Sequence, residues 1–202
     1  QSEINMLMHL GDSMGFNINT FTHILEGYKV AEKLQEHGAG GSTFSDWWAY
    51  KFEVNDAIPF NAALLNEAGV ITAINSDNAE MGRRLNQEAA KAVKYGNTSQ
   101  EDAWKMVTLN PAKLLHLDHR MGSIKVGKDA DIVLWSANPL SVYAVAEKTM
   151  IEGVVYYDIN EKLKIIQRSR NFLDKAYKLA TMDRYAKVKP KASVKYLKKV
   201  QK

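Results

Sequence analysis

Three side chains that can bind a metal or move a proton each follow a short apolar stretch. His23 comes directly after NINTFT, and single serines separate Asp46 from GGSTF and Asp77 from VITAIN. A neutral imidazole binds divalent metals, and a carboxylate can bind the same ion or take a proton from an attacking water. The chain has no cysteine, so any metal it binds must be held by His, Asp or Glu.

The elements that would position these side chains alternate between two periodicities. The apolar stretches are predicted strands at 17–22, 40–44 and 70–75. Helical spacing of apolar residues covers the segments around them: 2–15, 26–37, 59–69 and 79–96. Strands and helices that alternate in units of about 30 residues form parallel sheets covered by helices. Ligand sites in such sheets gather at the carboxyl ends of the strands, which brings the three side chains to one face.

Each of the three also has a purely structural interpretation. His23 can end a strand, Asp46 can cap a turn, and Asp77 can cap the helix that follows it. For Asp46 the turn cap is the favoured interpretation. For His23 and Asp77 together, the regular placement after strands favours a site.

After residue 96, where a glycine is expected to end the preceding helix, the pattern changes. Thr98 and Glu101 form a predicted capping box, and Asn110 with Pro111 is expected to start a short helix. Two strands are predicted within 122–135, around the turn at 127–129. A hairpin at 150–158 and a charged amphipathic helix at 160–182 complete the predicted elements.

Composition limits the class of protein. The 202 residues are 46% hydrophobic and 25% charged, as in a globular protein, and no stretch approaches the roughly 20 apolar residues of a membrane span. The net charge is +4, but residues 187–202 carry seven lysines and no acid, which leaves −3 for residues 1–186. We therefore expect a solvated, largely disordered basic tail rather than a nucleic-acid-binding protein.

Several motifs, in order, resemble one enzyme family. The stretch TLNPAKLLHLDHRMGSIKVGKDADIVLW (108–135) is similar to the passage from the last barrel helices into the accessory β-sandwich of metal-dependent amidohydrolases. More narrowly, THILEGYKVA (22–31), STFSDWWAYKFE (42–53) and INSDNAEMGRRLNQEAAKAVKYG (74–96) resemble imidazolonepropionase-related amidohydrolases. The resemblance covers roughly residues 1–160.

This resemblance implies an α/β fold, the C-terminal half of a (β/α)8 TIM-type barrel. Residues 1–118 would supply strands six to eight with their helices, and 119–160 accessory β-sandwich strands. A C-terminal helix would span 161–186, ahead of the basic tail at 187–202. The absent half of the barrel would then be a partner of this chain.

The resemblance also assigns roles to the two favoured side chains. NINTFTH matches the sixth strand with its histidine, so His23 would be a metal ligand or its close neighbour, and AINSD matches the eighth, so Asp77 would be the aspartate that touches metal and accepts a proton from water. The imidazole of His23 could bind the metal or stabilise a developing oxyanion, and both roles stay open. The implied cofactor is a divalent metal, zinc, as one or two ions. A metal lowers the pKa of its bound water to about 7 and polarises the scissile carbonyl.

Residues around the pair are candidates for supporting roles. The aromatic loop residues Trp47, Trp48 and Tyr50, together with Tyr28, are predicted to contact substrate, although tryptophans can equally pack under a long loop. Glu26 is a predicted partner that orients the imidazole, or else an ordinary carboxylate at a helix start. Glu80 and Arg83 are expected to form a local ion pair on the helix after Asp77.

The chain departs from the family pattern in what it lacks. No HxH motif occurs, strands one to four have no counterpart, and the fifth-strand histidine would precede Gln1. His9 lies within a helical pattern and is not favoured as its substitute, and His37, His116 and His119 are expected on the surface.

The predicted function is hydrolysis of amide or cyclic-amide C–N bonds in small molecules. This reaction requires the complete barrel, so the 202 residues alone are expected to be inactive. We expect no membrane partner, and the protein could form a homo-oligomer. Two alternatives stay open: a catalytically inactive amidohydrolase-like scaffold or interaction module, and a protein that binds polyanions through its basic tail.

Overall fold

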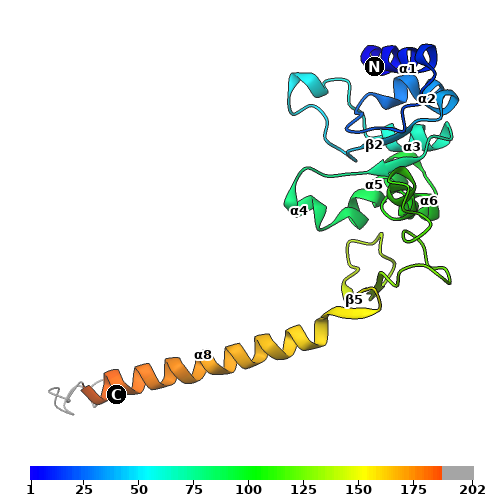
Figure 1. The fold of residues 1–202 in the computed structure, drawn as a ribbon. Helices are drawn as coiled ribbons and strands as arrows, with labels where there is room; N and C mark the ends of the chain where they lie inside the picture. Colours follow the sequence, from blue (N-terminus) through cyan, green and yellow to red (C-terminus); the bar gives the residue numbers. More distant parts are fainter. Residues whose placement is uncertain (188–202) are drawn as a thin grey trace. The chain divides into compact units, whose positions relative to one another are not determined.

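The computed structural model describes residues 1–187, and its first sheet is parallel. Strands β1 (Thr20–Phe21), β2 (Gly40–Thr43) and β3 (Thr72–Ile74) pair in the order β1-β2-β3 (Figure 1). Thr20 lies opposite Gly40, and Gly41 opposite Thr72. The predicted strand-helix alternation is confirmed, with strands shorter than expected.

Helices connect and cover these strands. Their bounds are α1 (Ser2–Met14), α2 (Ala31–His37), α3 (Asn61–Glu67), α4 (Ala79–Gly82), α5 (Leu85–Gly96), α6 (Gln100–Lys105) and α7 (Leu109–Leu114), with 3-10 turns η1 (Gly27–Val30) and η2 (Phe52–Val54). The single helix predicted at 79–96 is therefore wrong, because α4 ends at Gly82 and α5 starts after Arg84. Glycine in a helix interior costs about 1 kcal/mol relative to alanine, which weakens the helix at this point.

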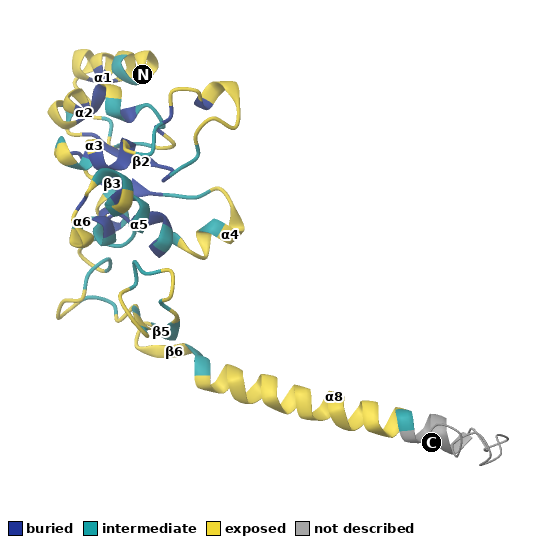
Figure 2. Ribbon diagram, turned by 180° about the vertical axis from the view of Figure 1, so that it is seen from behind, coloured by how far each residue is buried: buried dark blue, intermediate teal, exposed yellow. Residues whose placement is uncertain are grey.

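The core lies between the parallel sheet and its helices. One cluster joins α1, η1, α2 and α3 through Met8, Val30, Leu34 and Leu65, and a second contains Ala62, Ile74, Ala92 and Met106. Figure 2 shows the buried residues gathered in β2, β3 and the helices packed on them. The apolar periodicity in the sequence thus marks the faces that bury together.

Two buried asparagines tie helices to the sheet. Asn61, 2% exposed, donates from Nδ2 to the carbonyl of Ile24 (2.7 Å) and to Oγ1 of Thr43 (2.9 Å). Asn110 donates from Nδ2 to the carbonyl of Thr72 (2.8 Å). Asn110 was expected to cap α7, but it lies inside that helix, where its amide satisfies a strand carbonyl instead.

A second sheet is antiparallel and follows α7. Strands β4 (Ile132–Trp135), β5 (Ala146–Ile151) and β6 (Val154–Asp158) pair in the order β4-β5-β6. The hairpin between β5 and β6 is confirmed, and its turn residues Glu152 and Gly153 have φ of 49° and 79°. Positive φ at both central positions matches the twist of the flanking strands.

Three further local predictions are wrong. Ser99, not Thr98, caps α6, since its hydroxyl accepts from the amide of Asp102 at 3.0 Å. α5 includes Gly96, and Asn97 takes the left-handed position that ends the helix, with φ 53°. The strand expected within 122–126 is not formed: this segment is a loop held by Nζ of Lys128, which donates to the carbonyl of Met121 (3.2 Å) and to Ser123 Oγ (2.8 Å).

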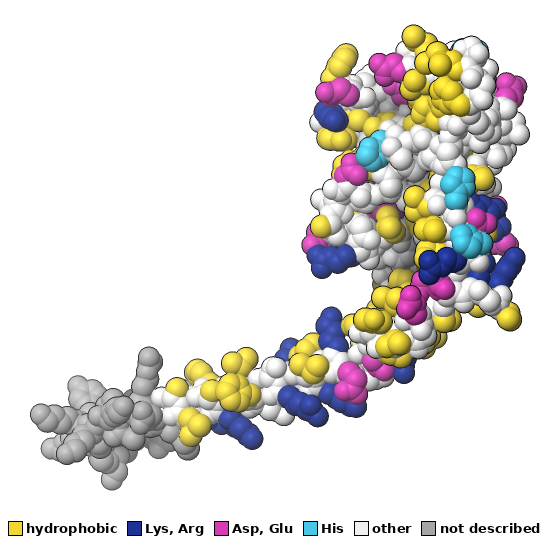
Figure 3. All heavy atoms as spheres, viewed as in Figure 1, with side chains coloured by type: hydrophobic (Ala, Val, Ile, Leu, Met, Phe, Trp, Pro, Cys, Tyr) yellow, Lys and Arg dark blue, Asp and Glu magenta, His cyan; other side chains and the backbone are white. Residues whose placement is uncertain are grey.

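The chain divides into two compact units, residues 1–156 and 157–202. Within the second, helix α8 (Ile159–Lys187) confirms the predicted C-terminal helix, and its residues 160–180 are all exposed. Hydrophobic and basic side chains both occur along this helix (Figure 3). The predicted basic tail lies almost entirely outside the described residues, and the predicted domain boundaries stay predictions. No helix within residues 1–187 combines the length and apolar character needed to cross a membrane.

Candidate functional site

His23 and Asp77 face each other at the carboxyl-terminal edge of the parallel sheet. His23 follows β1 and Asp77 follows β3, on either side of the central strand. Nε2 of His23 lies 3.4 Å from Oδ1 of Asp77, and the two side chains are 53% and 54% exposed. The pair is therefore both close together and accessible from solvent.

Backbone hydrogen bonds to the end of β2 fix the segments that carry the pair. The amide of Ile24 donates to the carbonyl of Ser42 (3.1 Å), and the amide of Asn75 donates to the carbonyl of Thr43 (3.1 Å). His23 itself adopts φ 59°, a left-handed conformation that is uncommon for a residue with a Cβ atom. A strained backbone held by neighbouring bonds is often found at functional sites.

Asp77 does not cap the following helix. Asn78 does so, with its Oδ1 accepting from the amides of Glu80 (2.9 Å) and Met81 (3.2 Å). The carboxylate of Asp77 is thereby left to face His23. The expected ion pair between Glu80 of α4 and Arg83, the residue directly after this helix, is present.

Aromatic side chains line one side of the pair. Phe44 stacks on the His23 imidazole with ring centres 5.2 Å apart and on Trp47 at 4.6 Å, and Tyr50 meets Trp47 edge-on at 5.9 Å. Trp48 points elsewhere and meets Tyr95 of α5 at 6.2 Å. Of the predicted substrate-contacting residues, Trp47 and Tyr50 thus belong to the cluster that includes His23.

Asp46 joins an ionic cluster instead of the His23–Asp77 pair. Nζ of Lys91 lies 2.7 Å from Asp46 and 2.9 Å from Glu88, whose side chain is 8% exposed and accepts a hydrogen bond from Ser45. Burial lowers the pKa of Lys91, but hydrogen bonds to Asp46 and Glu88 outweigh it and hold that pKa above its ordinary value. The cluster ties the start of the aromatic loop to α5.

Glu26 and Tyr28 lie in a separate polar cluster. Lys29 bonds to Asp56 and to Glu26 (3.0 Å), and these hydrogen bonds, that of Asp56 foremost, raise the pKa of Lys29 well above its ordinary range. The Tyr28 hydroxyl donates to the carbonyl of Asp56 at 3.0 Å. The carboxylate of Glu26 therefore engages an ammonium group, where the sequence predicted the imidazole of His23 as its partner.

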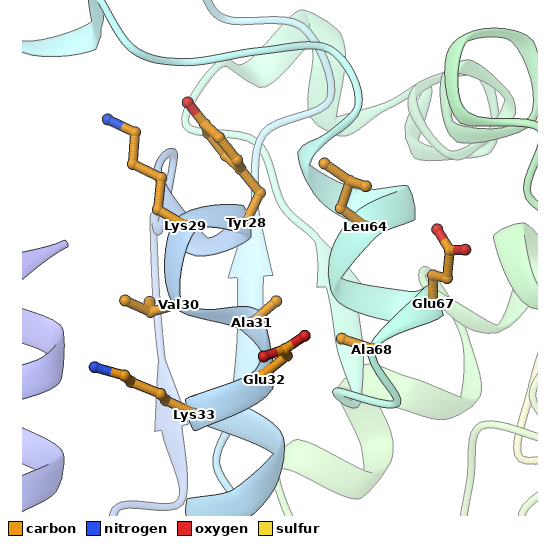
Figure 4. Close-up of a pocket in the computed structure, with 9 residues that line it drawn as sticks. All are labelled: Tyr28, Lys29, Val30, Ala31, Glu32, Lys33, Leu64, Glu67 and Ala68. Carbon is orange, nitrogen blue, oxygen red and sulfur yellow. The ribbon is translucent and has the colours of Figure 1, made fainter.

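Tyr28 also lines a pocket of about 590 Å³ between η1, α2 and α3 (Figure 4). Lys29 and Lys33 border this pocket along with Glu32 and Glu67. Lys29 and Lys33 are engaged by Asp56 and Asn5 respectively, so the pocket presents cations that already have partners.

The remaining histidines differ in burial. The prediction that His37 lies on the surface is wrong: its side chain is 3% exposed, Nε2 accepts from the amide of Ile18 (3.0 Å), and Nδ1 lies 2.7 Å from Asp12. These two partners are distant in sequence and hold α1 and α2 together. His9, His116 and His119 are exposed.

The distance between His23 and Asp77 fits two ligands of one metal ion. Ligand atoms held at about 2.0–2.2 Å by a tetrahedral zinc ion lie about 3.4 Å from each other, and imidazole with carboxylate is a common ligand set. A structural or catalytic zinc site needs at least three protein ligands. No group of three or more His, Asp or Glu side chains in the described residues could hold a metal, so His23 and Asp77 form at most part of a site.

Several residues around the pair were not singled out from the sequence. In the sequence pattern, Phe44 is the last apolar residue of a predicted buried strand. Glu88, Lys91 and Met81 lie in predicted helices, where nothing distinguishes them from other helix residues. Asn75 precedes Asp77 by two positions, and its side-chain Nδ2 and Oδ1 are buried without a hydrogen-bond partner in the described part of the chain.

With this geometry in place, comparison with known proteins identifies the family. The model of the amidohydrolase family matches residues 8–158. The chain belongs to the amidohydrolase family. Its sequence is 30% identical over 135 residues to imidazolonepropionase of Thermoplasma volcanium, a match that covers 66% of this chain and 33% of that protein.

Solved structures agree. An amidohydrolase from Thermotoga maritima superposes with a TM-score of 0.71 and 33% identity, over 78% of this chain and 41% of that one. An adenosine deaminase from Xanthomonas campestris with bound zinc superposes with a TM-score of 0.56 at 21% identity, over 81% and 44% of the two chains, which shows the fold alone. The chain thus spans less than half the length of these relatives.

Proposed function

We propose that this chain is the C-terminal part of a metal-dependent hydrolase that cleaves amide or cyclic-amide C–N bonds. Strands β1, β2 and β3 would be strands six to eight of a (β/α)8 barrel, and β4 to β6 part of an accessory β-sandwich. The observation that carries the proposal is the 3.4 Å approach of His23 and Asp77 at the carboxyl edge of a parallel sheet in an amidohydrolase. Catalytic side chains of such barrels lie at this edge.

His23 and Asp77 would hold a divalent ion. The distance between them is compatible with zinc, and the zinc bound by the Xanthomonas campestris relative makes zinc the ion that we propose. When bound, the ion supplies an activated water and a polarised carbonyl. The neutral imidazole of His23 offers its Nε2 lone pair, and the carboxylate of Asp77 takes a proton from water and returns it to the leaving nitrogen. This is general base followed by general acid catalysis.

Other ligands and substrate contacts would come from the rest of the barrel. The open edge of β3 supports this, since β3 pairs with β2 on one side and has no strand neighbour on the other within residues 1–187. The aromatic loop residues Trp47 and Tyr50 would form one wall of the substrate site. Flat apolar rings suit planar substrates such as cyclic amides.

The test uses the longer polypeptide that contains this chain and the remaining strands. His23→Ala and Asp77→Asn should each lower the turnover of a panel of cyclic amides and dipeptides by roughly 10²–10⁴-fold. His23→Ala should also lower the zinc content measured by atomic emission. His119→Ala, on an exposed turn, is the matched control and should change neither quantity. Unchanged turnover and zinc content in both site variants would contradict the proposal and favour a non-catalytic scaffold.

A further inference from the structure

The imidazole of His23 lies at one end of a stack of three nearly parallel rings. The planes of His23 and Phe44 differ by 17°, and those of Phe44 and Trp47 by 13°. Phe44 is the middle ring and is 7% exposed, whereas the His23 side chain is 53% exposed. The buried ring thus provides a fixed surface for one face of a largely open imidazole.

The stacked side chains are part of a series of contacts that links the three segments after β1, β2 and β3. Nε1 of Trp47 donates to Sδ of Met81 (3.0 Å) in α4, which follows Asp77. The carboxylate of Asp77 in turn faces Nε2 of His23 at 3.4 Å. The segments after β1, β2 and β3 are therefore linked by side chains as well as by the backbone bonds at Ser42 and Thr43.

The backbone bonds alone do not determine the direction of the imidazole. They fix the main chain at Ile24 and Asn75, but rotation about the Cβ–Cγ bond of His23 would carry Nε2 away from Asp77. Solvent occupies much of the surroundings of this side chain and does not oppose that rotation. A stacked aromatic ring does oppose it, because the imidazole would lose its face-to-face contact.

We propose that Phe44 is a positioning residue that holds the His23 imidazole in the plane that presents Nε2 to Asp77. Trp47 stacks on Phe44 in turn, and Met81 accepts a hydrogen bond from the Trp47 indole. The effect of Phe44 on catalysis rests on the proposed function. The orientation of the His23 imidazole by Phe44, the geometric part of the proposal, concerns only side chains of this chain. Phe44 acts through His23 and has no contact with the reacting atoms in the proposal.

The geometric part is tested by NMR on the 202-residue chain with labelled histidine, with His23 signals assigned by their loss in His23→Gln. Nuclear Overhauser effects between the imidazole protons and the Phe44 ring are expected, together with an upfield shift of those protons. The upfield shift should disappear in Phe44→Leu and Phe44→Met and persist in Phe44→Tyr. The control is Phe21→Leu, which removes from β1 an aromatic ring that packs against the core. This variant should retain the upfield shift.

The catalytic part is tested in the longer polypeptide. Phe44→Leu should lower kcat roughly 10- to 100-fold with KM nearly unchanged, as when a residue that orients a metal ligand is lost, and Phe44→Tyr should restore most of it. Absent Overhauser effects in the unmodified chain, or a Phe44→Leu variant with wild-type kcat, would overturn the positioning role. If His23→Ala itself retains full turnover and zinc, the proposed function fails, and that outcome is separate from the NMR result.

Discussion

At the scale of single residues, His23 combines an unusual backbone with a useful position. Its φ of 59° would cost little for glycine, which adopts positive φ freely, but about 1–2 kcal/mol for a residue with a Cβ atom. The bond from Ile24 to Ser42 and the contacts of the imidazole hold this conformation. The strain is therefore compensated by the backbone hydrogen bond of the next residue and by the ring contact of the His23 side chain itself.

We accordingly expect His23→Gly to be more stable than His23→Ala by about 1 kcal/mol, because both lose the imidazole and only alanine keeps the strain. Urea unfolding of the 202-residue chain, followed by circular dichroism, measures the difference. Ala68 has an ordinary φ of −70°, so Ala68→Gly should instead lose about 0.5–1 kcal/mol. An alanine at position 23 as stable as glycine would show that the left-handed conformation is not retained.

Lys91 is the second residue whose surroundings predict a measurable effect. Lys91→Met would leave Glu88, 8% exposed at its side chain, and Asp46 without their cation. We expect a loss of about 2–4 kcal/mol in the free energy of unfolding, since a buried carboxylate without a partner is strongly destabilising. Lys94 lies about one turn later in α5, is exposed and has its ammonium group over the Tyr95 ring, so Lys94→Met should stay within about 0.5 kcal/mol. Equal losses in the two variants would refute this account.

The pH dependence of the same cluster has a definite sign. The folded pKa of Lys91 lies above its ordinary value of 10.5. The stability that Lys91 contributes is therefore fully present below pH 10.5 and is lost as the pH rises through the folded pKa. Urea unfolding at pH 8 and at pH 11 should show the difference between the wild type and Lys91→Met narrowing at the higher pH, and a constant difference would contradict the assignment.

Residue types and spacing predicted the meeting of His23 and Asp77, because strand ends in a parallel sheet share one edge. The burial of His37 was not predictable in this way. Its partners Asp12 and Ile18 lie 25 and 19 residues away, and no local pattern marks such pairs. Phe44 was missed for a related reason, since an apolar residue ending a buried strand looks like core.

At the scale of elements, helix and strand types followed the apolar spacing, but boundaries depended on single contacts. Ser99 and Thr98 are both good caps by type, and only the position of Ser99 Oγ against the amide of Asp102 decides between them. The loop at 122–126 has a strand-like apolar pattern without a pairing strand in the described residues, and it is instead held by Lys128.

Helices α3 and α5 pack too closely for a side chain at Gly96. A Cβ atom there would lie 2.0 Å from Cβ of Ala63, so Gly96→Ala should lose about 1–3 kcal/mol through overpacking, despite the better helix propensity of alanine. Gly82, the last residue of α4, has open space around it, and Gly82→Ala should be neutral or gain up to about 1 kcal/mol. Thermal and urea unfolding of both variants provide the comparison, and a stabilised Gly96→Ala would mean that α3 and α5 lie further apart.

At the scale of the whole molecule, the chain consists of two compact units, and the family match ends at residue 158. The two edge strands of the parallel sheet, β1 and β3, each pair only with β2 within residues 1–187. Parallel sheets are normally larger and are covered by helices on both faces, whereas this sheet has three short strands and two unpaired edges. The sequence predicted this sheet and the approach of His23 and Asp77, but two side chains define a pair and not a coordination sphere.

The composition of the core predicts that the first unit folds without α8. Both buried clusters of the described residues consist of side chains from the first unit, between residues 4 and 107, so removal of α8 takes no member from either cluster. A chain of residues 1–158 should therefore unfold cooperatively in urea with a free energy of unfolding within about 0.5 kcal/mol of that of the whole chain. Its far-ultraviolet circular dichroism should decrease by the signal of the 29 residues of α8. Residues 1–187 serve as the control for deletion of the tail alone, and a loss of more than about 1 kcal/mol that appears only when α8 is removed would show that the helix stabilises the first unit.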